Sequence, residues 1–190
     1  MEMVEKGRFG AGDVLHFLVE RDSSVFVGKS FGGRYVVESV LGSTYVSVLL
    51  LARRRGLGDC CVIKVLLEDE PDSKLHQRFY REVRSLRELR HSAVVKLEDA
   101  GIEDGVPYYV MELLRGPNLH EYVAELRSRG EELDLGWVRR TFAAIADGLV
   151  HCHHMGVLHR DVKPENVMLN AEMEVVLIDF SLATIIPPGQ

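Results

Sequence analysis

The hydrophobic pattern of the chain changes its period once, and this change restricts the folds that the chain can adopt. Before Gly116 and Pro117, apolar residues alternate or form short runs, which is typical of β-strands. After this pair they recur at three- and four-residue steps, which is typical of amphipathic helices. The order predicts a strand-rich first half and a helical second half, with a candidate hinge at residues 113–117.

The first half is expected to contain several strands and one helix. The predicted strands are rich in β-branched and other apolar residues, and they cover residues 35–41, 44–52, 60–67, 94–102 and 106–114. Turns are expected at residues 42–43 and 103–105. Between the third and fourth strands, apolar residues at helical spacing predict a helix over residues 74–89 that starts near residues 71–73.

The second half is expected to contain two helices followed by short strands. The helices are predicted at residues 119–129 and 137–154, and the second should end near Gly156. Short apolar runs then predict strands at residues 157–159, 166–170 and 175–179.

These elements predict an α+β fold in three parts. Residues 1–33 are expected to be an N-terminal extension that is at most partly ordered, because their apolar patches are short. Residues 34–113 should form a lobe built on a twisted antiparallel sheet and one helix. Residues 114–190 should form a mainly helical lobe.

Composition and charge favour a globular protein of the cell interior. The 190 residues are 46% hydrophobic and 27% charged, which is sufficient for a packed core. A net charge of −6 argues against a general nucleic-acid or membrane-surface binder. The three cysteines, Cys60, Cys61 and Cys152, have no disulfide or metal spacing, which favours a reducing compartment. With no signal segment and no apolar run long enough for a membrane span, we expect a cytoplasmic location.

Three short motifs concentrate charged residues beside apolar segments. Residues 159–166 read HRDVKPEN and have the form H-R-D-x-x-x-x-N. Asp179 begins the triplet D-F-S directly after a predicted strand, and Lys64 ends the triplet V-I-K inside another. A lysine between apolar neighbours on a buried strand needs an anion, so the three motifs together indicate a site for a charged ligand.

In this order, the motifs resemble those of the eukaryotic-like serine/threonine protein kinase family. The resemblance extends from about Arg34 to the end of the chain and implies a kinase small lobe followed by the first part of the large lobe. It implies transfer of the γ-phosphate of ATP, with Mg²⁺, to serine or threonine hydroxyls of a protein substrate. Lys163 favours this branch over tyrosine kinases and over small-molecule kinases, which are a remote alternative.

The resemblance also implies the catalytic roles. Asp161 would orient the substrate hydroxyl and accept its proton, while Lys163 would neutralise the γ-phosphate. Lys64 would pair with the α- and β-phosphates. Glu82 would hold Lys64 in place, with Glu88 as the alternative.

Further residues would hold the metal and the nucleotide. Asn166 and Asp179 would bind Mg²⁺, and Gly42 would belong to the loop that covers the phosphates. The adenine would be contacted by Leu49, Val62, Met111, Glu112, Leu114 and Met168. An apolar column that links the lobes would consist of Leu86, Leu97, His159 and Phe180.

The chain departs from the family pattern at several positions. The phosphate-covering loop should read G-x-G-x-x-G, but Thr44 and Ser47 replace its second and third glycines. A positive φ at the β-branched Thr44 would be strained, so the loop should close less well. Val62 narrows the adenine pocket, and Ser181 replaces the glycine of D-F-G.

Two functional interpretations follow from these departures. The first is a serine/threonine protein kinase, and the second is a non-catalytic pseudokinase or truncated regulator that binds a kinase or another protein. The family's domain continues beyond the point where this sequence stops, so we expect either a fragment or a natural truncation. A metal site at His151, Cys152, His153 and His154 is not expected, because these positions do not share one helix face.

Overall fold

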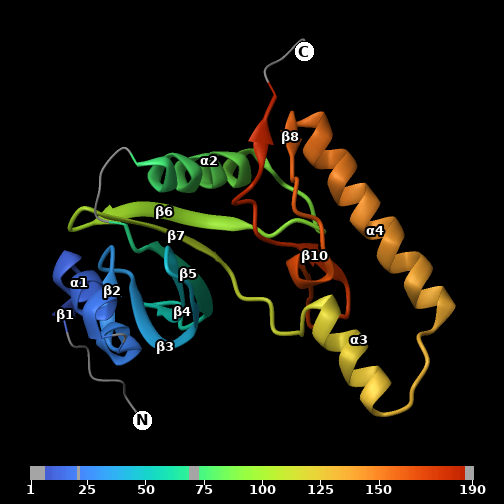
Figure 1. Ribbon diagram of the computed structural model, residues 1–190, viewed down its shortest axis with the longest axis horizontal. Helices are drawn as coiled ribbons and strands as arrows, with labels where there is room; N and C mark the ends of the chain where they lie inside the picture. Colours follow the sequence, from blue (N-terminus) through green and yellow to red (C-terminus); the bar gives the residue numbers. More distant parts are fainter. Residues whose placement is uncertain (1–6, 21, 69–72, 187–190) are drawn as a thin grey trace. The chain divides into compact units, whose positions relative to one another are not determined.

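The computed structural model describes residues 7–20, 22–68 and 73–186 (Figure 1). The chain divides into two compact units. The first unit comprises residues 1–79 and 97–113, and the second comprises residues 80–96 and 114–190.

The first unit is built on a curled sheet of mostly antiparallel strands. The described strands follow the spatial order β1-β2-β3-β4-β5-β7-β6, and only β1 and β2 pair in parallel. Their bounds are β1 Gly7–Arg8, β2 Lys29–Phe31, β3 Tyr35–Ser43, β4 Ser47–Arg54, β5 Cys60–Leu66, β6 Leu97–Glu103 and β7 Val106–Glu112. The sheet predicted from the alternating pattern is therefore present, with two additional short strands at its N-terminal edge.

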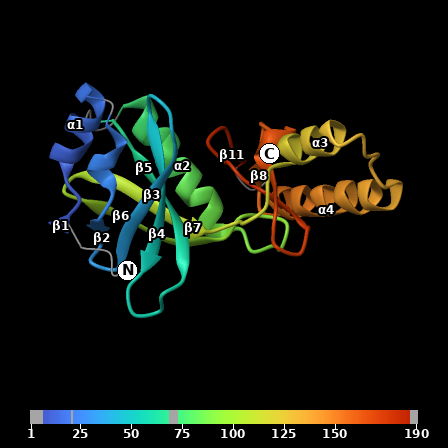
Figure 2. The same ribbon diagram turned by 90° about the horizontal axis from the view of Figure 1, so that it is seen from below.

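The N-terminal segment is an integral part of this unit, and the expectation of at most partial order is wrong for its described residues. It forms α1 (Ala11–Glu20) and a short 3-10 helix, η1 (Ser23–Phe26), beside β2 and β3 (Figures 1 and 2). The rings of Phe9 and Phe31 stack with centroids 4.3 Å apart, and both are buried. Periodicity missed this segment because its buried aromatic residues belong to short elements and loops.

Polar contacts join the two edges of the sheet. The β6–β7 turn lies at one edge and the N-terminal segment at the other. Glu103 pairs with Arg8 at 2.6 Å and accepts a hydrogen bond from the amide of Gly32 at 2.9 Å. The side chain of Asp104 accepts another from the amide of Ala11 at 3.1 Å. These bonds satisfy the backbone donors of Gly32, which lies between β2 and β3, and of Ala11, which begins α1.

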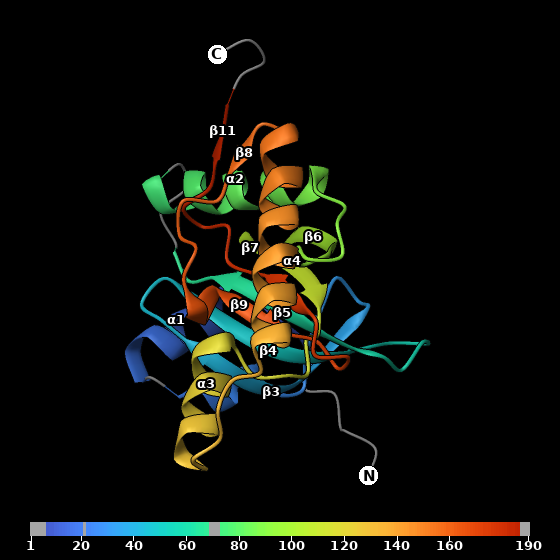
Figure 3. The ribbon, with the colours of Figure 1, turned by 90° about the vertical axis from the view of Figure 1, so that its right-hand side faces the viewer.

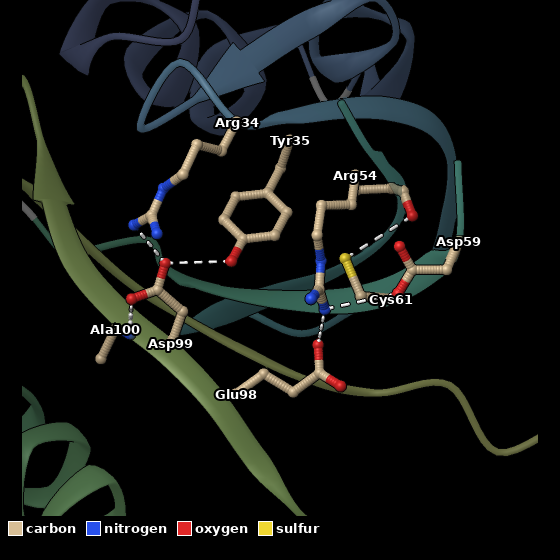
Figure 4. A network of polar contacts seen from close by, with 9 residues as sticks. Arg34, Tyr35, Arg54, Asp59, Cys61, Glu98, Asp99 and Ala100 are labelled. Carbon is tan, nitrogen blue, oxygen red and sulfur yellow. Dashed lines mark hydrogen bonds and ion pairs between the residues drawn. The ribbon is translucent and has the colours of Figure 1, made fainter. Parts of the chain in front are cut away.

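A second network joins β6 to the strands β3 and β4 (Figure 4). The buried Tyr35 donates its hydroxyl hydrogen to Asp99 at 3.0 Å, and Arg34 pairs with the same carboxylate at 2.5 Å. Burial, together with the bond to Asp99, raises the pKa of Tyr35 to about 12. Arg54 pairs with Glu98, so two consecutive acids of β6 are neutralised by arginines.

The hairpin turns follow the sequence only in part. In the β6–β7 turn, Asp104 and Gly105 have φ values of 48° and 81°, as expected for an Asp-Gly hairpin. The turn predicted at residues 42–43 lies instead at residues 44–46, because β3 continues through Ser43.

The helix α2 (Lys74–Glu88) contributes residues to both units. Its start is fixed by Ser73, whose hydroxyl oxygen accepts a hydrogen bond from the amide of His76 at 3.2 Å. The predicted start at Pro71 and Asp72 lies outside the described residues. Near the middle of the helix, Phe79 packs on Tyr109 of the first unit, with ring centroids 5.3 Å apart.

Besides the second part of α2, the described second unit contains the helices α3 and α4 and short strand pairs (Figure 3). The strands β9 and β10 form one antiparallel pair, and β8 and β11 form another beside the C-terminal end of α4. The bounds are α3 Leu119–Ser128, α4 Leu135–His154, β8 Val157–Leu158, η2 Pro164–Asn166, β9 Val167–Leu169, β10 Val175–Leu177 and β11 Thr184–Ile185.

Both helices of this unit begin at polar capping residues. Asn118 and Glu121 form a reciprocal capping box at the start of α3. Asp134 caps α4 by accepting from the amide of Trp137, so the helix begins two residues before the predicted position 137. After α4, Gly156 has a φ of 71°, which ends the helix as predicted.

The middle of α4 packs closely on the rest of the second unit. A Cβ atom at Gly148 would lie 3.2 Å from both Ala93 and Leu177, so only glycine fits there without displacement. The amide of Val95 donates to the carbonyl of Leu177 at 2.9 Å.

None of the described helices has the length and apolarity needed for a membrane span.

Candidate active site

The loop between β8 and β9 brings three of the predicted catalytic residues together. Oδ2 of Asp161 accepts hydrogen bonds from Lys163 Nζ and Asn166 Nδ2, each at 2.8 Å. Asn166 Nδ2 also donates to the backbone carbonyl of Asp161 at 2.9 Å. Asn166 is buried and rigidifies the loop from within, while the other two side chains reach the surface.

The charges of this cluster reinforce one another. The hydrogen bond from Lys163 lowers the pKa of Asp161 below its usual value, and the same bond raises the pKa of Lys163. Asp161 is therefore a carboxylate and Lys163 a cation at neutral pH. The carboxylate can accept a proton from a hydroxyl, and the cation beside it can attract an anionic group to the same place.

The imidazole of His159 contacts both this loop and Ile178, and these contacts define its tautomer. Its Nδ1 accepts a hydrogen bond from the amide of Asp161 at 3.3 Å, and its Nε2 lies 3.0 Å from the carbonyl of Ile178. This arrangement requires a neutral imidazole with the proton on Nε2. Burial, which leaves only 1% of the residue exposed, lowers the pKa of His159 and favours the same neutral form.

The same contacts place the D-F-S segment next to the loop. The amide of Ile178 donates to the carbonyl of Asn166 at 3.0 Å, so Asp179 follows directly after a residue that is bonded to the loop. The ring of Phe180 packs on His159 with centroids 4.5 Å apart. Asp179 has a φ of 59°, a left-handed conformation that aspartate tolerates and that is found at functional sites.

The predicted metal ligands offer the donor atoms that Mg²⁺ prefers. Asn166 uses its amide nitrogen for Asp161, which leaves the amide oxygen as the candidate ligand. Asp179 Oδ1 accepts from the amide of Ser181 at 3.2 Å and belongs to a carboxylate with further acceptor capacity. One carboxylate and one amide oxygen fit Mg²⁺, which binds few protein oxygens and keeps several waters.

In the first unit, the predicted nucleotide residues share one face of the sheet. Lys64 lies directly across from Leu49, and Val62 lies across from Met111. Since opposite residues of an antiparallel pair project to the same side, and residues two apart on a strand do so as well, these four side chains belong to one face. Gly42 is paired with Leu49 and extends this face toward the β3–β4 turn.

The other face of the same strands is the hydrophobic core of the unit. Ile63 and Val65 alternate with Val62 and Lys64 on β5 and are completely buried. They pack with the aromatic residues of the N-terminal segment, including Phe26. The alternation of β5 therefore separates a structural face from the candidate ligand face.

The remaining predicted residues are distributed over the two units. Leu97 and Glu112 belong to the first unit. Glu82, Leu86, Leu114 and Met168 belong to the second unit, and Glu82 is 2% exposed. The pairing of Lys64 with Glu82, the contacts to adenine and the column that links the lobes remain predictions.

The β3–β4 turn differs from the sequence-based expectation. Thr44 is not among the described residues with positive φ, so the strain predicted for it is absent. The side chain of Thr44 bonds to the turn instead, a role that the prediction missed. The sequence does contain a signal for this role. A threonine at the start of a short turn can accept hydrogen bonds from the amides two and three residues further on.

The histidine and cysteine residues outside the loop have structural contacts. His151 stacks on His91 at 5.2 Å and accepts from the amide of Arg90 at 3.2 Å. Burial raises the pKa of the Cys152 thiol to about 11 and that of Cys61 to about 12. Within the described ranges, no three histidine, cysteine or acidic side chains are grouped as a metal site would require.

Comparison with known proteins identifies the family. The family model described as "Protein kinase domain" matches residues 35–190. The chain is 34% identical over 160 residues to CBL-interacting protein kinase 4 of Oryza sativa subsp. japonica, covering 83% of this chain and 35% of that protein. It is 32% identical over 170 residues to serine/threonine-protein kinase pkn3 of Myxococcus xanthus, covering 86% of this chain and 30% of that protein.

A third relative matches the chain with a similar identity and coverage. Serine/threonine-protein kinase PrkC of Bacillus subtilis (strain 168) is 32% identical over 161 residues, which cover 84% of this chain and 24% of that protein. The chain thus spans about a quarter to a third of the length of these relatives. The match and the architecture confirm the predicted fold class, and the chain belongs to the protein kinase family.

Proposed function

We propose that the chain carries the nucleotide-binding and catalytic elements of a serine/threonine protein kinase. The proposed reaction transfers the γ-phosphate of ATP to a serine or threonine hydroxyl of a protein. The observation that carries the proposal is the hydrogen-bonded cluster of Asp161, Lys163 and Asn166, joined through Ile178 to the segment of Asp179. Such a cluster fits phosphoryl transfer, where positioned charges supply most of the catalysis.

Asp161 is the proposed base and positioning residue. Lys163 and Asn166 both donate to Oδ2 of this carboxylate, so Oδ1 is the oxygen we assign to the substrate hydroxyl. The bond from Asn166 to its backbone carbonyl and the bond from its amide to His159 fix the main chain on both sides of the carboxylate. This fixation orients the acceptor before the substrate arrives.

Lys163 is the proposed cation for the transferred phosphoryl group. Its Nζ lies 2.8 Å from Asp161, and its side chain is 47% exposed, so a phosphate oxygen could approach the same ammonium group. An ammonium has three donors and can bond to a carboxylate and a phosphate together.

Asn166 and Asp179 are the proposed metal ligands. These two residues would hold Mg²⁺, which would supply positive charge against the negative charge that develops on the transferred phosphoryl group. The protein's contribution is to hold the two oxygen donors on segments that are bonded to each other through Asn166 and Ile178.

The ligand face of the first unit is the proposed nucleotide surface. Lys64 would bind the α- and β-phosphates, with Glu82 as its partner. Leu49, Val62 and Met111 share the face of Lys64 and would pack against the adenine. The backbone of Glu112 and Leu114, together with Met168, would complete the adenine contacts.

Substrate class and location follow from the same residues. Lys163 within D-x-K-P-E-N supports serine or threonine as acceptor, as do the names of the relatives. A protein substrate or regulatory protein is the proposed partner. Use of ATP and the free thiols of Cys60, Cys61 and Cys152 support a cytoplasmic location.

The proposal is tested by nucleotide binding and phosphate transfer with matched variants. Lys64→Met and Asp161→Asn should abolish transfer of labelled γ-phosphate to a generic protein substrate, and Lys64→Met should also weaken ATP–Mg²⁺ binding. The exposed residues Lys74 and Asp147 provide the controls Lys74→Met and Asp147→Asn. Transfer that persists in both site variants at the control level would refute the assignment.

A second candidate function is a binding module without catalysis. The observation that favours it is the β3–β4 turn, where Thr44 bonds to the loop amides in place of a glycine. ATP–Mg²⁺ that raises the melting temperature without measurable transfer would support this module. A chain that responds to no nucleotide would instead be a protein-binding scaffold.

A further inference from the structure

The turn between β3 and β4 is closed by the side chain of Thr44. Its hydroxyl oxygen accepts hydrogen bonds from the amides of Val46 at 3.2 Å and Ser47 at 3.1 Å. The same hydroxyl lies 3.3 Å from both the carbonyl oxygen and the hydroxyl of Ser47. One threonine side chain thus occupies two consecutive backbone donors of the loop.

The backbone closes this turn independently of the hydroxyl. The amide of Thr44 donates to the carbonyl of Ser47 at 2.8 Å, and Ser43 pairs with Val48 just before it. The hairpin therefore retains its closing hydrogen bond when the hydroxyl is removed. Because these contacts are exposed, removing the hydroxyl leaves no buried donor without a partner.

The turn lies at the end of the proposed nucleotide face. Gly42 is paired with Leu49, and Leu49 is paired with Lys64. The loop amides of Val46 and Ser47 follow Gly42 by four and five residues on the same hairpin. They are the backbone donors of the loop that would cover phosphates in the proposed function.

We propose that Thr44 competes with nucleotide phosphates for the loop amides and thereby lowers the affinity of the chain for nucleoside triphosphates. An amide hydrogen that is bonded to Oγ1 of Thr44 cannot donate fully to a phosphate oxygen at the same time. Binding must therefore break two internal bonds, which a loop with glycine at this position would not contain. This inference rests on the proposed function and assigns to Thr44 an affinity-lowering role at the same site.

The experiment compares two substitutions that differ in the hydroxyl. Thr44→Val keeps the β-branched shape and removes the acceptor, whereas Thr44→Ser keeps the acceptor. The dissociation constants of ATP–Mg²⁺ and of adenosine are measured for the full chain and for each variant by isothermal titration. Adenosine has no phosphate, so its affinity reports on the remainder of the nucleotide surface alone.

Thr44→Val should lower the dissociation constant of ATP–Mg²⁺ roughly three- to tenfold. This factor corresponds to the net free energy of one intramolecular hydrogen bond that no longer competes with the phosphates. Its affinity for adenosine should equal that of the original chain, and Thr44→Ser should behave like the original chain with both ligands. Thr44→Ala, which also lacks the acceptor, provides the same comparison should the valine variant fail to fold.

The outcomes separate this inference from the proposed function. Adenosine binding with an unchanged or weakened ATP affinity in Thr44→Val and Thr44→Ala would overturn the role of Thr44 alone. A chain that binds neither adenosine nor ATP in any variant would overturn the nucleotide site, and the role of Thr44 with it.

Discussion

The amide of Asp161 donates a hydrogen bond to Nδ1 of His159 over 3.3 Å, so a buried imidazole holds the main chain of the proposed base. The other ring nitrogen lies 3.0 Å from the carbonyl of Ile178. One neutral side chain therefore connects the proposed catalytic loop with the segment that carries Asp179. Protonation of His159 would remove the acceptor on Nδ1 and break one of these two connections.

The stability of the chain should depend on the protonation of His159. Burial lowers the pKa of this residue from 6.5, so between the lowered value and 6.5 the unfolded chain binds more protons than the folded chain. The free energy of unfolding that His159 contributes is thus fully present above pH 6.5 and declines as the pH falls through this window. Urea unfolding at several pH values should show the decline in the original chain and a weaker one in His159→Phe.

The substitution His159→Phe should also lower stability at neutral pH by about 1–3 kcal/mol, because a buried amide and a buried carbonyl lose their partner. His154, which is exposed on the last turn of α4, provides the control His154→Phe. If both variants had the same pH dependence, His159 would not be the titrating group.

Removing Lys163 should raise the pKa of Asp161. The hydrogen bond from Lys163 is the largest cause that lowers this pKa, so Lys163→Met should move it upward and Lys163→Arg should largely preserve it. Carbon-13 chemical shifts of the Asp161 carboxyl group, followed against pH, measure this directly and do not require catalysis. An identical titration in Lys163→Met would show that the 2.8 Å contact has no electrostatic effect in solution.

The N-terminal segment should be required for the stability of the first unit. Phe26 is fully buried and packs on Phe9 and Phe17, so Phe26→Ala should lower the free energy of unfolding by about 3–5 kcal/mol. Tyr45 is 83% exposed, and Tyr45→Ala should change stability by no more than about 0.5 kcal/mol. Chemical denaturation of both variants checks this, and equal stabilities would argue that the segment does not belong to the core.

Replacing two helical glycines by alanine should change the stability of the chain in opposite directions. A Cβ at Gly148 would lie 3.2 Å from Ala93 and Leu177, so Gly148→Ala should destabilise the second unit by about 1–3 kcal/mol. A Cβ at Gly12 of α1 would meet nothing within 4 Å, and Gly12→Ala should stabilise by about 0.4–1 kcal/mol. Thermal unfolding distinguishes the two signs. A stabilised Gly148→Ala would mean that α4 can shift away from its neighbours.

The sequence predicted the contacts within the proposed catalytic loop better than those around it. Asp161, Lys163 and Asn166 lie within six residues, so a short loop brings them together whatever the rest of the chain does. The apolar, β-branched run of β5 likewise predicted a strand, and the register places Lys64 across from Leu49. Local patterns of this kind need no knowledge of distant contacts.

Other features depended on contacts that are distant in sequence. The burial of Phe9 and Phe31 depends on strands that lie further along the chain, and no local period marks these residues. The glycines of the family pattern predict a strained positive φ at the β-branched Thr44, whereas Thr44 is not among the described residues with positive φ and its hydroxyl bonds to the turn amides. The partnership of Lys64 with Glu82 remains a prediction.

The assignment of neighbouring side chains of β5 to opposite faces also limits how this strand can change during evolution. Ile63 and Lys64 are sequence neighbours, but one fills the interior and the other belongs to the ligand face. Inserting or deleting one codon before them would exchange every inward and outward side chain beyond that point. Viable descendants of this gene should therefore vary β5 by amino-acid replacement and keep its length constant.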